Sequence, residues 1–147
     1  MIIIIKKEWY PMKTLKYSRQ REELYELLSS VNTHPTADWL YGELRKSIPS
    51  ISLGTVYRNL TLLIEAGKVQ KITVGTSTDH FDANTSNHYH FVCNCCGQVY
   101  DLDMDVMENL EQEAQDQSGH EVTDHSLLFY GTCNACKEKQ KENRKED

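Results

Sequence analysis

The sequence predicts an α+β chain made of two modules, because its hydrophobic pattern, its charges and its cysteines all change along the chain. Three stretches within residues 18–67 repeat apolar residues at helical spacing, and two short alternating stretches follow them. Residues 1–74 contain 11 Lys+Arg and 7 Asp+Glu, whereas residues 75–147 contain 5 and 15. All five cysteines lie in the acidic part. These observations predict an N-terminal module over residues 1–83 and a C-terminal module over residues 84–147.

Three helices are predicted in the first module, and each follows a residue that can cap it. The first covers Arg19–Ser30, the second ends before Pro49, and the third ends at Gly67. The three predicted capping residues are Ser18, Thr36 and Ser52. Each helix carries apolar residues three and four positions apart, so each is expected to bury one face.

A β-hairpin is predicted after the third helix, with strands over Val69–Val74 and Thr78–Phe81 and a turn at Gly75. Three helices followed by a hairpin is the order of a winged helix-turn-helix domain, in which the third helix reads DNA. The basic charge of this half suits contact with phosphates. The same order of elements also fits a structural module without DNA, and the pattern alone leaves both interpretations open.

The second module is predicted to contain three strands and a helix. The strands are expected over Tyr89–Cys93, Gln98–Leu102 and Glu121–Tyr130, and the helix over Met104–Gln117. The apolar run Leu127–Phe129 suggests that the last strand is buried. The tail from Lys137 to Asp147 consists of charged and amide residues, which predicts a frayed helix or no regular structure.

Four of the five cysteines form two C-x-x-C pairs, Cys93/Cys96 and Cys133/Cys136. Two such turns supply the four thiolates of a closed tetrahedral zinc site, whose role is structural because no coordination position stays open. A redox dithiol or ordinary buried thiols are the alternatives. Cys95 is interpreted as a spare thiol that is either packed or reactive.

A second group of metal-binding side chains contains nitrogen and oxygen but no sulfur. His88 and His90 lie on one face of a predicted strand, because side chains alternate with period two. Asp82, Asp101 and the distant His34 complete a set that suits Fe(II), Mn(II) or Zn(II). By spacing alone, the pattern is a weak indication, because histidines in a small protein are more often surface residues or satisfied core residues than metal ligands.

The chain resembles the ferric uptake regulator family from about Ser18 to Cys136. The matching segments are His34-Pro-Thr-Ala-Asp38, Pro49-Ser-Ile-Ser-Leu-Gly-Thr-Val-Tyr-Arg-Asn-Leu60, His88-Tyr-His90, Cys93-x-x-Cys96-Gly97 and Tyr130-Gly-x-Cys133-x-x-Cys136. The resemblance implies a winged-helix DNA-binding domain, a C-terminal dimerisation domain, and a homodimer that binds inverted-repeat operator DNA when a regulatory metal is bound.

The resemblance also implies the site residues. Structural Zn²⁺ is assigned to Cys93, Cys96, Cys133 and Cys136, and regulatory Fe²⁺ or Mn²⁺ to His34, Asp82, His88, His90 and Asp101. Aspartates at 82 and 101 favour the peroxide-sensing branch, in which the histidines matching His34 and His88 are oxidised. A further metal site of many iron sensors would use Asn87, Tyr89, Glu108 and His125, and only the last two of these can ligate. The DNA contacts are expected from Arg19, Arg21, Ser52, Thr55, Tyr57, Arg58 and Asn59.

Several other classes of protein are disfavoured. No apolar run reaches the roughly 18 residues that span a bilayer, and the Met1–Lys7 start lacks the order of a signal peptide, so a cytoplasmic protein is expected. A zinc hydrolase is disfavoured because no H-E-x-x-H segment is present, so the chain is not expected to be an enzyme. The remaining alternatives are an iron, manganese or zinc uptake repressor of the same family and a zinc-ribbon module that does not bind DNA.

Overall fold

The computed structural model describes residues 15–75 and 78–144, and the chain divides into two compact units, Met1–Ser86 and Asn87–Asp147. The division lies three residues after the predicted boundary. The start at Met1–Lys7, on which the expectation of a cytoplasmic protein partly rested, lies outside the described residues. Among the residues that are described, no helix is both long and apolar enough to cross a bilayer.

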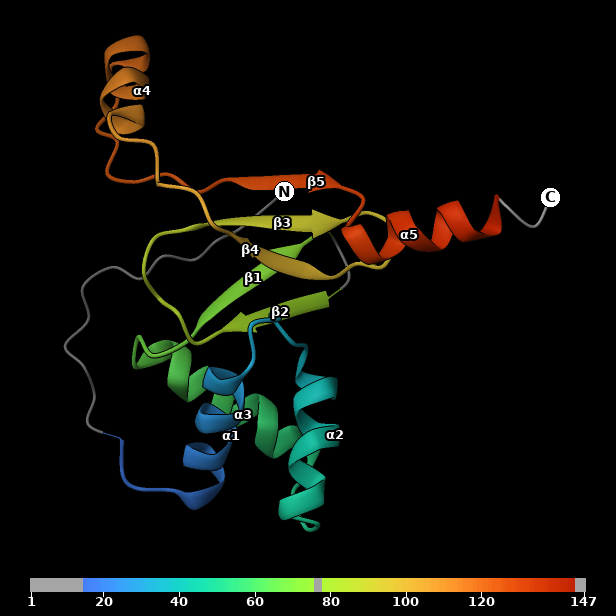
Figure 1. Ribbon diagram of the computed structural model, residues 1–147. Coiled ribbons are helices and arrows are strands. Elements are labelled where there is room, and N and C mark those ends of the chain that lie inside the picture. The colour runs from blue at the N-terminus through green and yellow to red at the C-terminus, as the bar shows by residue number, and fades with distance from the viewer. Residues whose placement is uncertain (1–14, 76–77, 145–147) are drawn as a thin grey trace. The chain divides into compact units, whose positions relative to one another are not determined.

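The N-terminal unit has the winged helix-turn-helix order (Figure 1). Its helices are α1 (Arg19–Ser30), α2 (Ala37–Ser47) and α3 (Leu53–Glu65), followed by the antiparallel hairpin of β1 (Gln70–Val74) and β2 (Thr78–Asp82). The three helices bury their apolar faces against one another, with Leu24, Leu40 and Leu60 at most 1% exposed. Phe81 brings β2 into the same core. This packing explains why the helical spacing predicts all three helices correctly.

Two of the three predicted caps are confirmed by hydrogen bonds. The Trp39 N–H donates to Thr36 Oγ1 at 3.3 Å, and the Thr55 N–H donates to Ser52 Oγ at 3.1 Å. Ser18 occupies the predicted capping position of α1, but its side chain makes no capping hydrogen bond. Gly67 ends the α3 region with a φ of +70°, a left-handed conformation that glycine adopts without steric cost.

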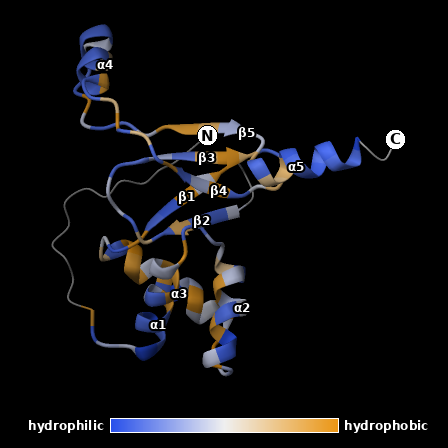
Figure 2. Ribbon diagram, viewed as in Figure 1, coloured by the Kyte–Doolittle hydropathy of each residue, from blue (hydrophilic) through white to orange (hydrophobic). Residues whose placement is uncertain are grey.

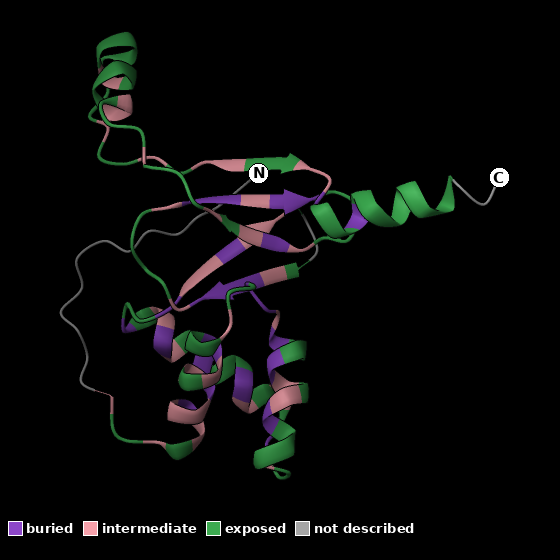
Figure 3. Ribbon diagram, in the orientation of Figure 1, coloured by how far each residue is buried: buried purple, intermediate pink, exposed green. Residues whose placement is uncertain are grey.

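The C-terminal unit is built on a three-stranded sheet in the order β4-β3-β5. The central strand β3 (Tyr89–Cys93) pairs antiparallel with β4 (Val99–Leu102) and parallel with β5 (Leu128–Gly131). Two helices complete the unit, α4 (Leu110–Ser118) and α5 (Asn134–Asn143). Figure 2 shows that both are mainly hydrophilic, and Figure 3 shows that most of their residues are exposed. The small apolar interior of this unit therefore comes mainly from its strands and its cysteines.

Two element predictions in this unit were wrong in extent. The helix predicted from Met104 begins only at Leu110, because the Met107 N–H donates to the Tyr89 hydroxyl at 2.8 Å and Asn109 has a φ of +67°. The strand predicted from Glu121 begins only at Leu128. Its partner β3 starts at Tyr89, and the His90 N–H donates to the Leu127 carbonyl at 3.4 Å just before the paired residues begin.

The burial predicted for Leu127–Phe129 was also wrong in part. Leu127 and Leu128 are half-buried, and Phe129 is 41% exposed. These residues lie on or next to β5, which is an edge strand of the described sheet. β5 has a neighbouring strand on one side only. The tail prediction is confirmed in its helical form by α5, and residues 145–147 lie outside the described part of the chain.

Candidate metal centres

The four predicted zinc ligands lie together in the C-terminal unit. The sulfur atoms of Cys93, Cys96, Cys133 and Cys136 are all within 4.8 Å of one another. The Cys96 and Cys133 sulfurs are 3.8 Å apart, which is about the edge of a tetrahedron with zinc–sulfur bonds of about 2.3 Å. β3 ends at Cys93, and Gly97 has a φ of +73° in the turn that brings Cys96 back to the cluster. Cys133, at the N-cap of α5, and Cys136, in its first turn, supply the second pair.

Hydrogen bonds within the cluster shift the pKa values of its thiols in opposite directions, and these shifts bear on cation binding. The Cys133 N–H donates to Cys93 Sγ at 3.3 Å, and this hydrogen bond lowers the pKa of the Cys93 thiol to about 6. The pKa of Cys136 is raised, chiefly by its hydrogen bond with the Cys133 thiol. Neighbouring thiolates oppose further ionisation, and a bound cation removes that opposition. Four sulfur donors without an open position fit structural zinc.

Cys95 is not one of the four clustered ligands. It is exposed, in the turn between Cys93 and Cys96. The interpretation of Cys95 as a spare thiol therefore stays compatible with the cluster geometry.

Two of the five predicted regulatory ligands lie together in the N-terminal unit. His34 follows α1, Asp82 is the last residue of β2, and both side chains are less than 10% exposed. His34 Nδ1 lies 3.8 Å from Asp82 Oδ1. We call this pair the N-terminal half-site.

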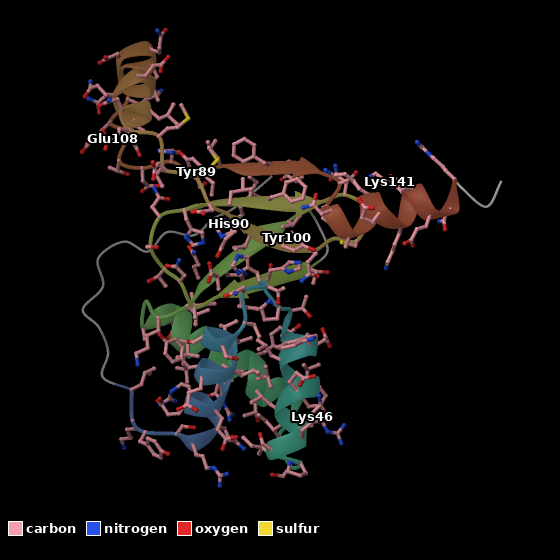
Figure 4. The ribbon with its side chains drawn as sticks, in the orientation of Figure 1. Lys46, Tyr89, His90, Tyr100, Glu108 and Lys141 are labelled. Carbon is pink, nitrogen blue, oxygen red and sulfur yellow. The ribbon has the colours of Figure 1, made fainter. Side chains whose placement is uncertain are left out.

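The other three predicted ligands lie together in the C-terminal unit and are here called the C-terminal half-site. His90 pairs with Asp101 across β3 and β4, and His88 immediately precedes β3. The Asp101 Oδ1 atom lies 2.8 Å from His88 Nε2 and 3.4 Å from His90 Nε2. The two imidazole centres are 4.4 Å apart, which confirms that both rings lie on one face of the strand. Figure 4 labels His90 next to Tyr89 on β3.

Both half-sites offer only nitrogen and oxygen donors. Imidazole and carboxylate together suit Fe(II), Mn(II) and Zn(II), whereas thiolates would have favoured zinc. Their donors converge within each unit at distances typical of ligands around an ion or of an ion pair. The residues therefore fit a divalent regulatory metal.

The sequence reasoning missed two residues that orient Asp82. The Gln70 side-chain amide donates to Asp82 Oδ2 at 3.1 Å, and the Asn84 N–H donates to Asp82 Oδ1 at 2.7 Å. Gln70 also faces Asp82 in the strand register, so the predicted hairpin contained a signal that could have identified it. Hydrogen bonds to a ligating carboxylate fix its direction before a metal binds.

Two of the positions of the further metal site of many iron sensors, Tyr89 and His125, lie within hydrogen-bond distance of each other. The Tyr89 hydroxyl lies 2.6 Å from His125 Nε2, and His125 Nδ1 lies 2.7 Å from Glu111 Oε1. Both imidazole nitrogens of His125 are therefore engaged by protein groups. Tyr89 is fully buried and offers a phenol where a metal site would need a carboxylate or imidazole.

Most of the predicted DNA-contacting residues lie at the surface of the N-terminal unit. Tyr57 is 47% exposed, and Arg58 and Ser52 are also exposed at or near the start of α3. Thr55 is half-buried, and its hydroxyl lies 2.9 Å from that of Ser52. Arg19 is exposed and forms an ion pair with Glu23 at 2.7 Å.

Two of the residues predicted to contact DNA are buried. Arg21 is 6% exposed, and its guanidinium donates to the Lys16 carbonyl oxygen. Asn59 is 4% exposed on the inner face of α3. Both side chains are therefore buried in the fold of the N-terminal unit, and their contact with DNA stays a prediction.

Comparisons with known proteins show the family to which the chain is similar. The family model described as Ferric uptake regulator family matches residues 12–130. The peroxide-responsive repressor PerR of Staphylococcus aureus is 38% identical over 125 residues, which cover 85% of this chain and 84% of that protein.

Two solved structures share the fold and a substantial part of the sequence. The Campylobacter jejuni peroxide stress regulator has 34% identity and a TM-score of 0.67, over 80% of this chain and 88% of that one. The Vibrio cholerae ferric uptake regulator has 33% identity and a TM-score of 0.68, over 81% of this chain and 92% of that one. The chain therefore belongs to the ferric uptake regulator family.

Proposed function

We propose that this protein is a metal-dependent transcriptional repressor that binds operator DNA as a homodimer and releases it after oxidation by hydrogen peroxide. It acts in the cytoplasm by binding rather than by enzymatic turnover. The observation that carries the proposal is the ligand chemistry: each unit holds a half-site of imidazole and carboxylate donors, separate from the four-cysteine cluster. The similarity to peroxide-responsive regulators supports this choice of branch.

The two half-sites are proposed to hold one regulatory Fe²⁺ or Mn²⁺ through His34, Asp82, His88, His90 and Asp101. Only residues 83–87 separate Asp82 from His88, and residues 84–87 are exposed. Ligands on both sides of this short connection would restrict the orientation of the two units once they share an ion. The coupling to DNA is then the difference in metal affinity between the DNA-competent orientation and the others.

The domain roles follow from this arrangement. We assign DNA binding to the unit that contains α3, and dimerisation to the unit that contains the β4-β3-β5 sheet. In a dimer on an inverted repeat, the two α3 helices must enter successive major grooves about 34 Å apart. A fixed orientation of the units is what sets that spacing.

Peroxide is proposed to act on the ligands themselves. Bound Fe(II) would mediate transfer of one oxygen atom from hydrogen peroxide to an imidazole carbon, with water as the other product. His34 and His88 are the rings assigned to this reaction. A ring that has gained oxygen is a poorer nitrogen ligand, so the half-sites lose affinity and the DNA-competent orientation is no longer favoured.

The peroxide proposal predicts different behaviour of the Fe(II)-loaded and Mn(II)-loaded proteins. Duplex DNA selected from a random library by the Mn(II)-loaded protein serves as the probe, and fluorescence anisotropy measures binding without oxygen. A small dose of hydrogen peroxide is expected to remove binding by the Fe(II) form only. Mass spectrometry should then find one added oxygen on the peptides containing His34 or His88.

An uptake repressor without peroxide sensing is the second candidate, since the Vibrio cholerae regulator is also similar in sequence and fold. In that case, both metal forms keep their DNA after peroxide, and neither peptide gains mass. Loss of DNA binding without any change in these two peptides would contradict the proposed oxidation step.

A further prediction concerns Arg58 on the exposed face of α3. Arg58→Ala is expected to weaken operator binding by about 1–3 kcal/mol and, if Arg58 reads a base, to relax specificity at one position. Arg45→Ala on α2 is the matched control, because it removes the same charge from a side chain that lies over Tyr41. Equal losses in both variants at several salt concentrations would show that only net charge matters at position 58.

A further inference from the structure

A buried histidine outside both candidate metal centres forms a hydrogen bond with the backbone of a proposed metal ligand. His80 lies on β2 and is 9% exposed. Its Nδ1 atom lies 2.6 Å from the carbonyl oxygen of His34. A carbonyl oxygen only accepts hydrogen bonds, so Nδ1 carries the proton and donates it. The bond joins two residues that are 46 positions apart in the sequence.

The segment that carries His34 runs along β2. The Phe81 N–H donates to the Pro35 carbonyl at 3.0 Å, and Thr36 forms an isolated antiparallel bridge with His80. These backbone contacts hold residues 35 and 36. The His80 imidazole adds a contact at residue 34 itself, which is the residue that carries the ligand.

His80 and Asp82 lie on the same side of β2, because residues two apart along a strand share a face. His34 Nδ1 lies 3.8 Å from Asp82 Oδ1 on that side. The His80 hydrogen bond therefore holds the backbone of one proposed ligand beside the carboxylate of another. All three residues are at most 9% exposed, so water competes little for this bond.

We propose that His80 is a positioning residue for the regulatory metal: its Nδ1–H fixes the His34 backbone so that the His34 imidazole and Asp82 are arranged as ligands before the ion binds. The role in metal binding rests on the function proposed above, whereas the hydrogen bond itself does not. Outer groups that orient ligands typically change metal affinity by about 10–100-fold when removed.

Two substitutions of nearly equal size separate the hydrogen bond from packing. His80→Asn keeps an N–H donor close to the position of Nδ1, and His80→Leu removes it. Mn(II) affinity is measured by the electron paramagnetic resonance of the free ion in zinc-replete protein. H80L is expected to bind Mn(II) at least about 10-fold more weakly than wild type, and H80N is expected to remain much closer to wild type.

Val69→Ala is the control for general destabilisation, because Val69 is buried in the core of the same unit. It is expected to lower the unfolding midpoint and to leave Mn(II) affinity near that of wild type. Equal affinities in wild type, H80L and H80N would overturn the proposal. A loss in V69A as large as that in H80L, or equal losses in H80L and H80N, would also overturn it.

A metal-free measurement separates this inference from the function on which it rests. Nitrogen-15 spectra of the imidazoles in metal-free wild type are expected to show His80 with a slowly exchanging proton on Nδ1. Absence of that proton contradicts the positioning role. If the proton is present and H80L weakens Mn(II) binding, but Mn(II) does not change DNA binding, the positioning role stands and the proposed repressor function fails.

Discussion

Cys133→Ser is expected to release zinc from the four-cysteine cluster and to unfold the C-terminal unit. Cys133 is 7% exposed, and it packs with Cys93, Cys136, Phe91 and Tyr100 as part of the small interior of that unit. α4 buries none of its residues, and α5 buries only Cys136. A sheet of strands four or five residues long has little apolar area of its own, so the metal is expected to supply much of its stability.

The expected loss of stability is large because the binding free energy of structural zinc is about 10–16 kcal/mol in small domains. This free energy is available only to the folded state. Elemental analysis should find one zinc per wild-type chain and less than one in C133S, and circular dichroism should show loss of strand signal. Cys95→Ser is the matched control, since Cys95 is exposed and is not among the four ligands. A C133S protein with full zinc and an unchanged unfolding midpoint would refute the structural role.

His90→Ala is expected to shift metal-dependent DNA binding to much higher Mn(II) concentrations while zinc stays bound. The His90 side chain is 4% exposed, and its Nε2 lies 3.4 Å from Asp101 Oδ1 in the C-terminal half-site. Loss of a direct ligand should lower Mn(II) affinity by more than the roughly 10–100-fold that follows loss of an outer group. DNA binding at a given Mn(II) concentration should weaken as well, because a smaller fraction of the protein then holds the ion that favours the DNA-competent orientation.

The test compares DNA binding of wild type, H90A and His120→Ala at a fixed Mn(II) concentration and then across a Mn(II) titration. His120 is exposed after α4 and belongs to neither metal centre, so H120A should behave as wild type. H90A should require much more Mn(II) for the same DNA affinity and should retain one zinc. Wild-type DNA binding by H90A at low Mn(II) would exclude His90 from the regulatory site.

The two candidate centres differ in ligand chemistry and in position along the chain, which suits the separate roles proposed for them. Four thiolates surround an ion completely and lie within one unit, so that site changes the stability of a single fold. The imidazoles and carboxylates of the two half-sites come from segments on both sides of residues 83–87. Such ligands suit the reversible metal binding, the control of orientation and the oxidation of the imidazoles that are proposed for this site.

Much of the fold was predictable because local patterns agreed with the packing. The three helices of the N-terminal unit and the strand over Tyr89–Cys93 have the predicted bounds or lie within a few residues of them. Helical apolar spacing and capping residues reflect burial of one face, which is the same physical cause that stabilises the folded helix. The cysteine pairs were equally predictive, because C-x-x-C spacing itself forms half of a tetrahedral site.

The sequence by itself therefore determined the α+β class, the order of elements in the N-terminal unit, and the identity of the clustered cysteines. Tertiary structure decided the late start of α4, the short β5, and the burial of Arg21 and Asn59, because each depends on partners distant in the sequence. It also decided the hydrogen bond between the His80 imidazole and the His34 backbone. Hydrogen bonds between residues far apart in the chain leave no periodic signal, so only the folded strands bring these donors and acceptors together.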